Sequence, residues 1–158
     1  MMEEKKFFMR EAFRVAIEGV GKGIGGPFGA VVVRNGEIIS RGCNSVLSTN
    51  DPTAHAEVVA IREACKNLGS FQLNDCEIYT SCEPCPMCMG AIYWARPLRV
   101  YFAANRFDAA AAGFDDSFIY DELLLPGEER KIPLLPFLRE ESAALFKVWN
   151  DSPLKKQY

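Results

Sequence analysis

Two short clusters of chemically capable side chains stand out in the sequence. The first, His55-Ala56-Glu57, contains the only histidine of the chain and a carboxylate two positions after it. The second, Pro84-Cys85-Pro86-Met87-Cys88, contains two cysteines spaced three positions apart. On the first turn of a helix this spacing directs both sulfurs to one side. One imidazole and two thiolates form a ligand set that Zn²⁺ commonly takes in proteins.

We expect His55, Cys85 and Cys88 to bind one Zn²⁺ ion. Three protein ligands leave the fourth tetrahedral position to water, which is the arrangement of catalytic zinc. The positive end of a helix favours the thiolate form of cysteine, and two thiolates neutralise the dication. Because Zn²⁺ acidifies its bound water, a nearby carboxylate can accept the proton and pass it to a leaving group. Glu57 is predicted to do this.

Each of these residues also has a simpler interpretation. An isolated Cys-x-x-Cys pair is commonly a redox pair or half of a structural zinc site, for which Cys82 is the candidate fourth ligand. A lone His55 could be a satisfied polar residue, and Glu57 could merely stabilise a helix N-terminus. The separate His-x-Glu element disfavours the redox pair. The joint pattern therefore favours a catalytic zinc site.

Helices must begin at both clusters if the ligands are to meet. Asn35-Gly36 predicts a tight hairpin, and the pattern of apolar residues and turn residues predicts the other elements. The expected helices cover residues 4–20, 54–68, 86–96 and 138–149, and the expected strands cover 28–34, 37–42, 76–80, 98–104 and 131–135. Strands that alternate with helices indicate a layered α/β fold. Because no linker or repeat interrupts the pattern, we expect a single domain over residues 1–158.

Composition narrows the class of protein. The chain has 158 residues, of which 49% are hydrophobic and 25% charged, so it can form a core without disulfides. No apolar run approaches the ~18–20 residues that span a bilayer, and the N-terminus lacks the features of a signal peptide. We therefore expect a cytoplasmic protein with no membrane partner. The net charge of −3 and a single small basic cluster, Lys155-Lys156, argue against a nucleic-acid partner.

The combination of His-x-Glu with Pro-Cys-x-x-Cys is typical of zinc-dependent nucleobase deaminases. Over nearly its whole length the chain resembles bacterial guanine deaminases of the cytidine deaminase superfamily. The segments that carry the resemblance are GIGGPFGAV (23–31), NDPTAHAE (50–57), YTSCEPCPMC (79–88), GAIYWARP (90–97) and AGFDDSFIY (112–120).

The resemblance implies roles in purine binding for residues that the zinc motifs do not include. Asn44 would hydrogen-bond the purine, Phe28 and Trp94 would line or stack on its ring, and Asp116 and Tyr158 would recognise its polar edge. Without the resemblance, these residues would be interpreted as a capping asparagine, two core aromatics, a loop acid and a frayed chain end.

The resemblance also implies the reaction and the assembly. The expected reaction is hydrolytic deamination of guanine to xanthine and ammonia by a zinc-activated water, with the Ser81 carbonyl orienting the amine. The alternatives are a tRNA adenosine deaminase, a deaminase of another aminated heterocycle, or a non-catalytic zinc or redox module. The implied fold is a three-layer α/β/α cytidine-deaminase-like fold with a five-stranded mixed sheet. The implied assembly is a homodimer that exchanges C-terminal segments.

Overall fold

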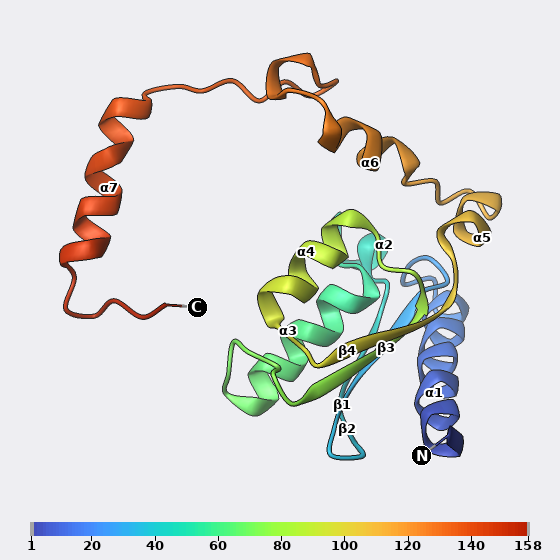
Figure 1. The fold of residues 1–158 in the computed structure, drawn as a ribbon. Coiled ribbons are helices and arrows are strands. Elements are labelled where there is room, and N and C mark those ends of the chain that lie inside the picture. The colour runs from blue at the N-terminus through green and yellow to red at the C-terminus, as the bar shows by residue number, and fades with distance from the viewer. Residues whose placement is uncertain (1, 158) are drawn as a thin grey trace. The chain divides into compact units, whose positions relative to one another are not determined.

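The computed structural model describes residues 2–157 (Figure 1). The helices are α1 (Met2–Gly21), α2 (Val46–Thr49), α3 (Ala56–Leu68), α4 (Pro86–Ala95), α5 (Arg106–Ala111), α6 (Ser117–Leu124) and α7 (Arg139–Asp151), with a 3₁₀ turn η1 (Gly127–Glu129). The strands are β1 (Gly29–Arg34), β2 (Glu37–Cys43), β3 (Cys76–Cys82) and β4 (Arg99–Ala104). The chain divides into an N-terminal unit, Met1–Asp116, and a C-terminal unit, Ser117–Tyr158.

The N-terminal unit is built on a mixed sheet with strand order β2-β1-β3-β4. Strand β1 pairs antiparallel with both β2 and β3, whereas β3 and β4 are parallel. The predicted hairpin at Asn35-Gly36 is confirmed: both residues have positive φ, 53° and 80°, as a tight turn between twisted strands requires. The parallel pair β3 and β4 is joined through α4, the crossover helix that carries the second cysteine of the motif.

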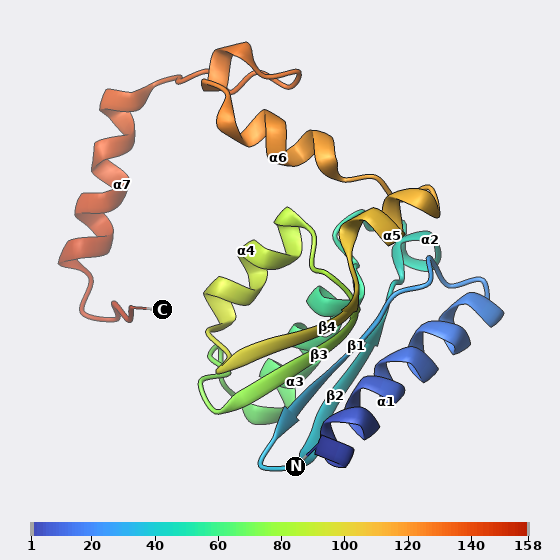
Figure 2. The same cartoon turned by 45° about the vertical axis from the view of Figure 1, so that its right-hand side comes forward.

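Helices cover both faces of this sheet, which gives the three layers expected (Figures 1 and 2). Residues of β1 alternate between the faces. Val31 and Val33 pack with Phe8 of α1, whereas Ala30 and Val32 belong to the core beneath α3 and α4. The alternation follows from the two-residue period of a strand, and both sets are buried because each face has a helical cover.

Two glycines let helices approach the sheet closely, one of them at the start of α3. A Cβ atom on Gly42 of β2 would lie 2.3 Å from the Ala56 carbonyl oxygen, in the first turn of α3. A Cβ atom on Gly29 of β1 would lie 2.2 Å from the Ala12 carbonyl oxygen in α1. Since no side chain could occupy these spaces, glycine at position 42 lets the start of α3 rest directly on β2.

The prediction of a five-stranded sheet is wrong for the residues described, which form four strands. The expected fifth strand at 131–135 is irregular chain. Pro133 and Pro136 lack the N–H groups that a strand needs for its hydrogen-bond ladder. The Leu134 N–H instead donates to the Gly127 carbonyl at 2.9 Å, within the C-terminal unit.

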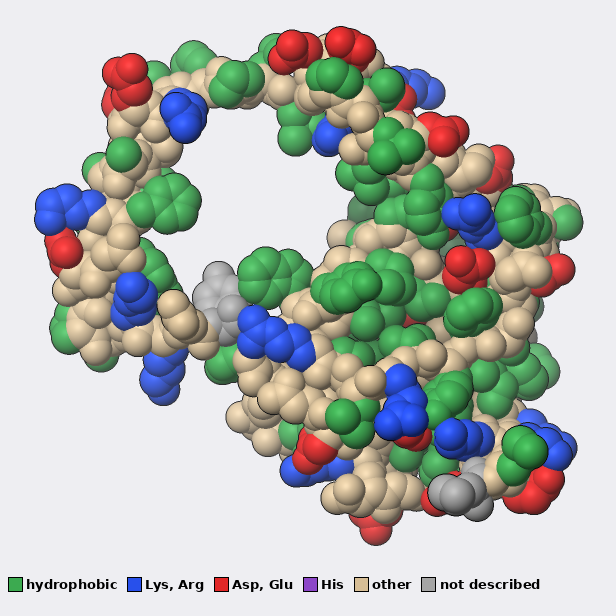
Figure 3. All heavy atoms as spheres, viewed as in Figure 1, with side chains coloured by type: hydrophobic (Ala, Val, Ile, Leu, Met, Phe, Trp, Pro, Cys, Tyr) green, Lys and Arg blue, Asp and Glu red, His purple; other side chains and the backbone are tan. Residues whose placement is uncertain are grey.

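The C-terminal unit consists of α6, η1 and α7 with irregular connections. None of its described residues, 117–157, is buried. Its apolar side chains are exposed along both helices (Figure 3), with Leu124 85% and Leu145 70% exposed. Within the described residues, no helix combines the length and apolar character needed to cross a membrane.

Candidate active site

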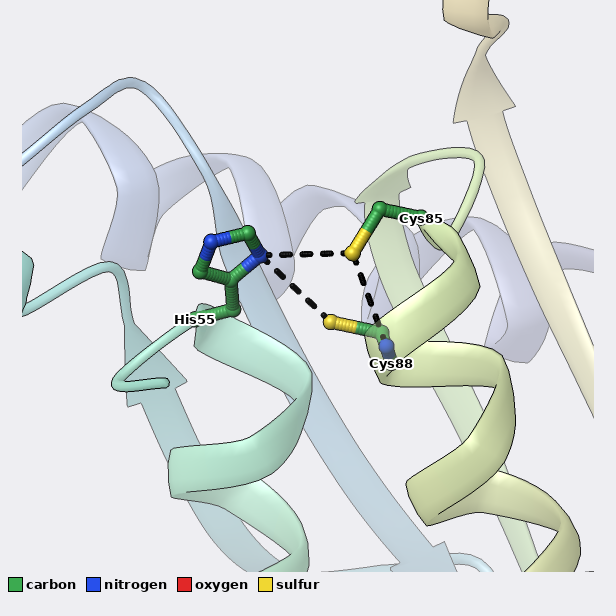
Figure 4. Close-up of side chains that lie close together, drawn as sticks. All are labelled: His55, Cys85 and Cys88. Carbon is green, nitrogen blue, oxygen red and sulfur yellow. Dashed lines mark hydrogen bonds between the residues drawn. The ribbon is translucent and has the colours of Figure 1, made fainter. Parts of the chain in front are cut away.

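The two helix N-termini bring the predicted metal ligands together. His55 precedes the first residue of α3 and Cys85 precedes that of α4, both with extended backbone. The His55 Nδ1 atom lies 3.5 Å from Cys85 Sγ and 3.6 Å from Cys88 Sγ (Figure 4). Pro86 opens α4, where its missing N–H costs no helical hydrogen bond. The Cys88 N–H donates to Cys85 Sγ at 3.5 Å, which caps the same helix.

This cluster has the donor set of a catalytic zinc site. One ligand atom from each of His55, Cys85 and Cys88 lies within 4.8 Å of the other two. Within residues 2–157, no further residue of these types (His, Cys, Asp or Glu) has a ligand atom within this distance of all three. Cys82, the candidate for a structural fourth ligand, instead donates its thiol to the Asn105 carbonyl at 3.6 Å. Three protein donors fit an ion that keeps one position for water.

Hydrogen bonds within the cluster shift the pKa values of its three members in different directions. Hydrogen bonds from Cys88 and His55 lower the pKa of Cys85 to about 4, which favours the thiolate form. The bond to Cys85, together with burial, raises the pKa of Cys88. The bond to Cys85 also raises the pKa of His55. A cation favours the ionised form of both thiols and the neutral form of imidazole.

Glu57 lies on the first turn of α3 and is only 5% exposed. The Thr80 hydroxyl donates to its Oε1 atom at 3.0 Å, and the Cys88 thiol lies 3.4 Å from its Oε2 atom. Burial raises the pKa of Glu57. A carboxyl group whose pKa is raised is suited to receive and return a proton near neutral pH.

Thr80 was missed by reasoning from the sequence. It lies on β3 two positions after Ile78 and is fully buried, on the face that packs against α3 and α4. A hydroxyl at a core position of a strand was the available signal, because buried polar groups require partners.

Asn44 follows β2 and is 6% exposed. Its side-chain oxygen accepts hydrogen bonds from the backbone N–H groups of Gly26 (3.2 Å) and Val46 (3.3 Å). These two bonds determine which way the amide faces. The oxygen is held by the protein, so the NH₂ group is the part that can donate to a ligand.

Phe28 contacts the loop before α6, and the same loop carries Asp116. The Phe28 ring packs edge-on against Phe114, with centroids 4.9 Å apart. A Cβ atom on Gly26 would lie 3.1 Å from the Phe114 ring and 3.2 Å from the Phe28 ring. Burial, followed by the charge of Cys85, raises the pKa of Asp116. Phe114 was not among the predicted site residues, although it lies within the AGFDDSFIY segment (112–120).

Trp94 and Tyr158 are the other two residues predicted to bind the purine. Trp94 is 64% exposed on α4, so it is not a core aromatic. Tyr158 lies outside the described residues.

Comparison with known proteins agrees with this geometry. Residues 2–104 match the family model of the cytidine and deoxycytidylate deaminase zinc-binding region. Guanine deaminase of Bacillus subtilis is 59% identical over 151 residues, which are 96% of this chain and 97% of that protein. A tRNA-specific adenosine deaminase of Aquifex aeolicus is 46% identical over 100 residues, 63% of this chain and 66% of that protein.

Solved structures give the same grouping. The structure of Bacillus subtilis guanine deaminase matches with a TM-score of 0.95 at 58% identity, covering 97% of this chain and 98% of that one. Guanine deaminase from Nitrosomonas europaea matches with a TM-score of 0.66 at 33% identity, covering 69% and 63% of the two chains. The chain therefore belongs to the cytidine and deoxycytidylate deaminase family of zinc-binding enzymes.

Proposed function

We propose that the protein hydrolyses guanine to xanthine and ammonia. The observation that carries this proposal is the extent of its likeness to Bacillus subtilis guanine deaminase. That likeness covers 96% of the chain in sequence, beyond residues 2–104 of the shared zinc-binding region. A tRNA-specific adenosine deaminase of Aquifex aeolicus, in contrast, is 46% identical over 63% of the chain. A solved tRNA:A34 deaminase covers 98% of the chain but matches at 29% identity and a TM-score of 0.62. The higher identity and TM-score of the guanine deaminase favour a free purine base over a nucleic acid as substrate.

In this proposal His55, Cys85 and Cys88 hold Zn²⁺ through one nitrogen and two sulfurs. Their mutual distances, all within 4.8 Å, support a single shared ion. Bound zinc acts as a Lewis acid that makes water nucleophilic near neutral pH. Burial of Cys88, which is fully enclosed, strengthens the electrostatic attraction within the site.

Glu57 moves the protons. It accepts one from the water that attacks C2 of guanine and delivers it to the adjacent ring nitrogen. It then takes the remaining hydroxyl proton and gives it to the departing amine, so that water and guanine are converted to xanthine and ammonia. Its burial and its raised pKa support this exchange, because the carboxyl can hold a proton between steps.

Asn44 and Asp116 recognise the polar edge of the base. Because the Asn44 side-chain oxygen is already occupied by two backbone N–H groups, its NH₂ group donates to an acceptor on the purine. Asp116 accepts from the N–H groups of guanine. The rings of Phe28 and Trp94 line or stack on the base, the Ser81 carbonyl orients the amine, and Tyr158 closes over the purine.

We further infer that residues 1–158 act as one catalytic domain in a cytoplasmic enzyme of purine catabolism. The assembly is a homodimer that exchanges C-terminal segments. The exposed apolar side chains of α6 and α7 support this assembly, because apolar surface of this extent is normally covered in solution.

A substrate panel tests the proposed activity. The zinc-loaded enzyme is incubated with guanine, guanosine, adenine, cytosine, cytidine and a tRNA anticodon stem-loop, and ammonia release is measured. We expect guanine to be strongly preferred, because a buried group that pairs with the substrate penalises analogues that leave it unpaired. Faster deamination of adenosine in the stem-loop would instead make the protein a tRNA deaminase.

A further inference from the structure

The carboxyl group of Glu57 has two chemically different surroundings. Its Oε1 atom accepts from the Thr80 hydroxyl at 3.0 Å. Its Oε2 atom lies 3.4 Å from Cys88 Sγ, one of the three predicted zinc-ligand atoms. One oxygen is therefore held by β3 while the other faces the cluster.

The hydroxyl of Thr80 is fixed in position. Thr80 has no exposed surface, and its backbone is paired with Ala30 on β1 and Phe102 on β4. A threonine side chain on a buried strand has little rotational freedom. The donor is thus supplied by the most constrained part of the sheet rather than by a loop.

Two side chains contact this carboxyl group among the hydrogen bonds of the described residues. Cys88 is itself a predicted zinc ligand, whereas Thr80 is not. The backbone N–H of Glu57 also donates to the carboxyl group. Loss of the Thr80 hydroxyl would remove a restraint on Oε1 and ease rotation of the carboxylate about its last bond, since such torsions are broad.

We propose that Thr80 is a positioning residue for Glu57, whose hydroxyl holds Oε1 so that Oε2 faces the water and the base in the metal site. This role rests on the proposed deaminase activity. Thr80 does not touch the reacting atoms. It keeps the proton-transferring oxygen within reach of them, and small displacements of a catalytic group lower rates strongly.

The test compares Thr80→Val with Thr80→Ser in the zinc-loaded enzyme, using guanine as substrate. Valine keeps the shape of threonine but removes the donor, whereas serine keeps the donor. We expect Thr80→Val to lower kcat by about 10–100-fold, in line with the loss of one hydrogen bond to a charged group. KM should remain within about threefold of the parent value, and Thr80→Ser should restore kcat to within about threefold. Zinc stoichiometry should be unchanged in both variants. A crystal structure of Thr80→Val should show the Glu57 carboxylate rotated.

Ser40→Ala is the matched control. The Ser40 hydroxyl is also buried on the sheet and donates to α3, at the Ala60 carbonyl (2.7 Å), and no hydrogen bond of the described residues joins it to Glu57. We expect this variant to lose stability and keep kcat. If Thr80→Val does not fold, Thr80→Ala tests the same donor with less steric demand.

Two results would overturn the proposal. One is a kcat within threefold of the parent in a zinc-loaded variant without the hydroxyl. The other is a parallel loss of zinc and activity that serine does not rescue, which would make Thr80 a structural residue. Failure of the proposed function is distinguishable, because the parent enzyme itself would then release no ammonia from guanine.

Discussion

The N-terminal and C-terminal units use their apolar residues in opposite ways. In the N-terminal unit, β1 and β3 are buried between helices on both faces of the sheet. In the C-terminal unit no described residue is buried, although α6 and α7 both carry large apolar side chains. All cysteines and the single histidine of the chain also belong to the N-terminal unit.

This difference shows which unit can hold catalytic side chains in fixed positions. The predicted metal ligands and Glu57 need a rigid support, and a close-packed sheet supplies it. The C-terminal unit buries none of its described residues, and exposed apolar surface of this extent commonly marks an interaction surface. The units should therefore respond differently to substitution.

The largest effect is expected from Glu57→Gln, which tests whether the chemistry resides in the N-terminal unit. Glutamine keeps the shape of the side chain but cannot shuttle protons. Turnover of guanine should fall by about 10²–10⁴-fold, with zinc content unchanged. Steady-state kinetics and metal analysis of the same preparation measure both quantities. Near-normal turnover in the zinc-loaded variant would contradict the role of Glu57.

A smaller effect is expected from removing one aliphatic side chain in each unit. Ile78→Ala, at a site with no exposed surface, should lower the free energy of unfolding by about 2–5 kcal/mol through lost burial and a cavity. Leu145→Ala, at a site that is 70% exposed, should lower it by less than about 0.5 kcal/mol in dilute protein. Denaturant titration gives both values.

The stability costs of the same two substitutions should depend differently on protein concentration. If a second copy covers α7, the cost of Leu145→Ala grows as the homodimer forms, because association stabilises only the folded chains. The cost of Ile78→Ala should not change, since Ile78 is buried within its own chain. A small cost for Leu145→Ala at every concentration, together with a dimeric mass by light scattering, would show that α7 lies outside the dimer interface.

The smallest effect is expected in the pH dependence of stability at alkaline pH, through Tyr79 in the core beneath α1. Burial, followed by the hydrogen bond to Glu77, raises the pKa of Tyr79. Its contribution to stability is fully present below pH ~10, the unfolded value, and is lost as pH rises towards the folded value. The slope should not exceed about 1.4 kcal/mol per pH unit. Tyr79→Phe should flatten this dependence in denaturant titrations at pH 9–11. An equally steep decline in the variant would assign it to another group.

Local patterns were sufficient to predict most of the N-terminal unit. Asn35-Gly36 predicted the hairpin, and the motifs at His55 and Cys85 predicted helices that begin at the predicted zinc ligands. The strand predicted at 131–135 failed because its apolar residues suggested pairing, while Pro133 and Pro136 remove the donors that pairing needs. Short apolar runs do not by themselves distinguish a strand from exposed irregular chain.

The sequence by itself determined the donor atoms and their order: an imidazole, a carboxylate two positions later, and two sulfurs three positions apart. These follow from residue type and helical spacing, which are local. Only the tertiary structure decided that Thr80 reaches Glu57 and that Phe114 packs on Phe28. Those contacts join residues 23 and 86 positions apart. They depend on strand register and on the close approach of helices to glycines, and neither is encoded in the neighbouring sequence.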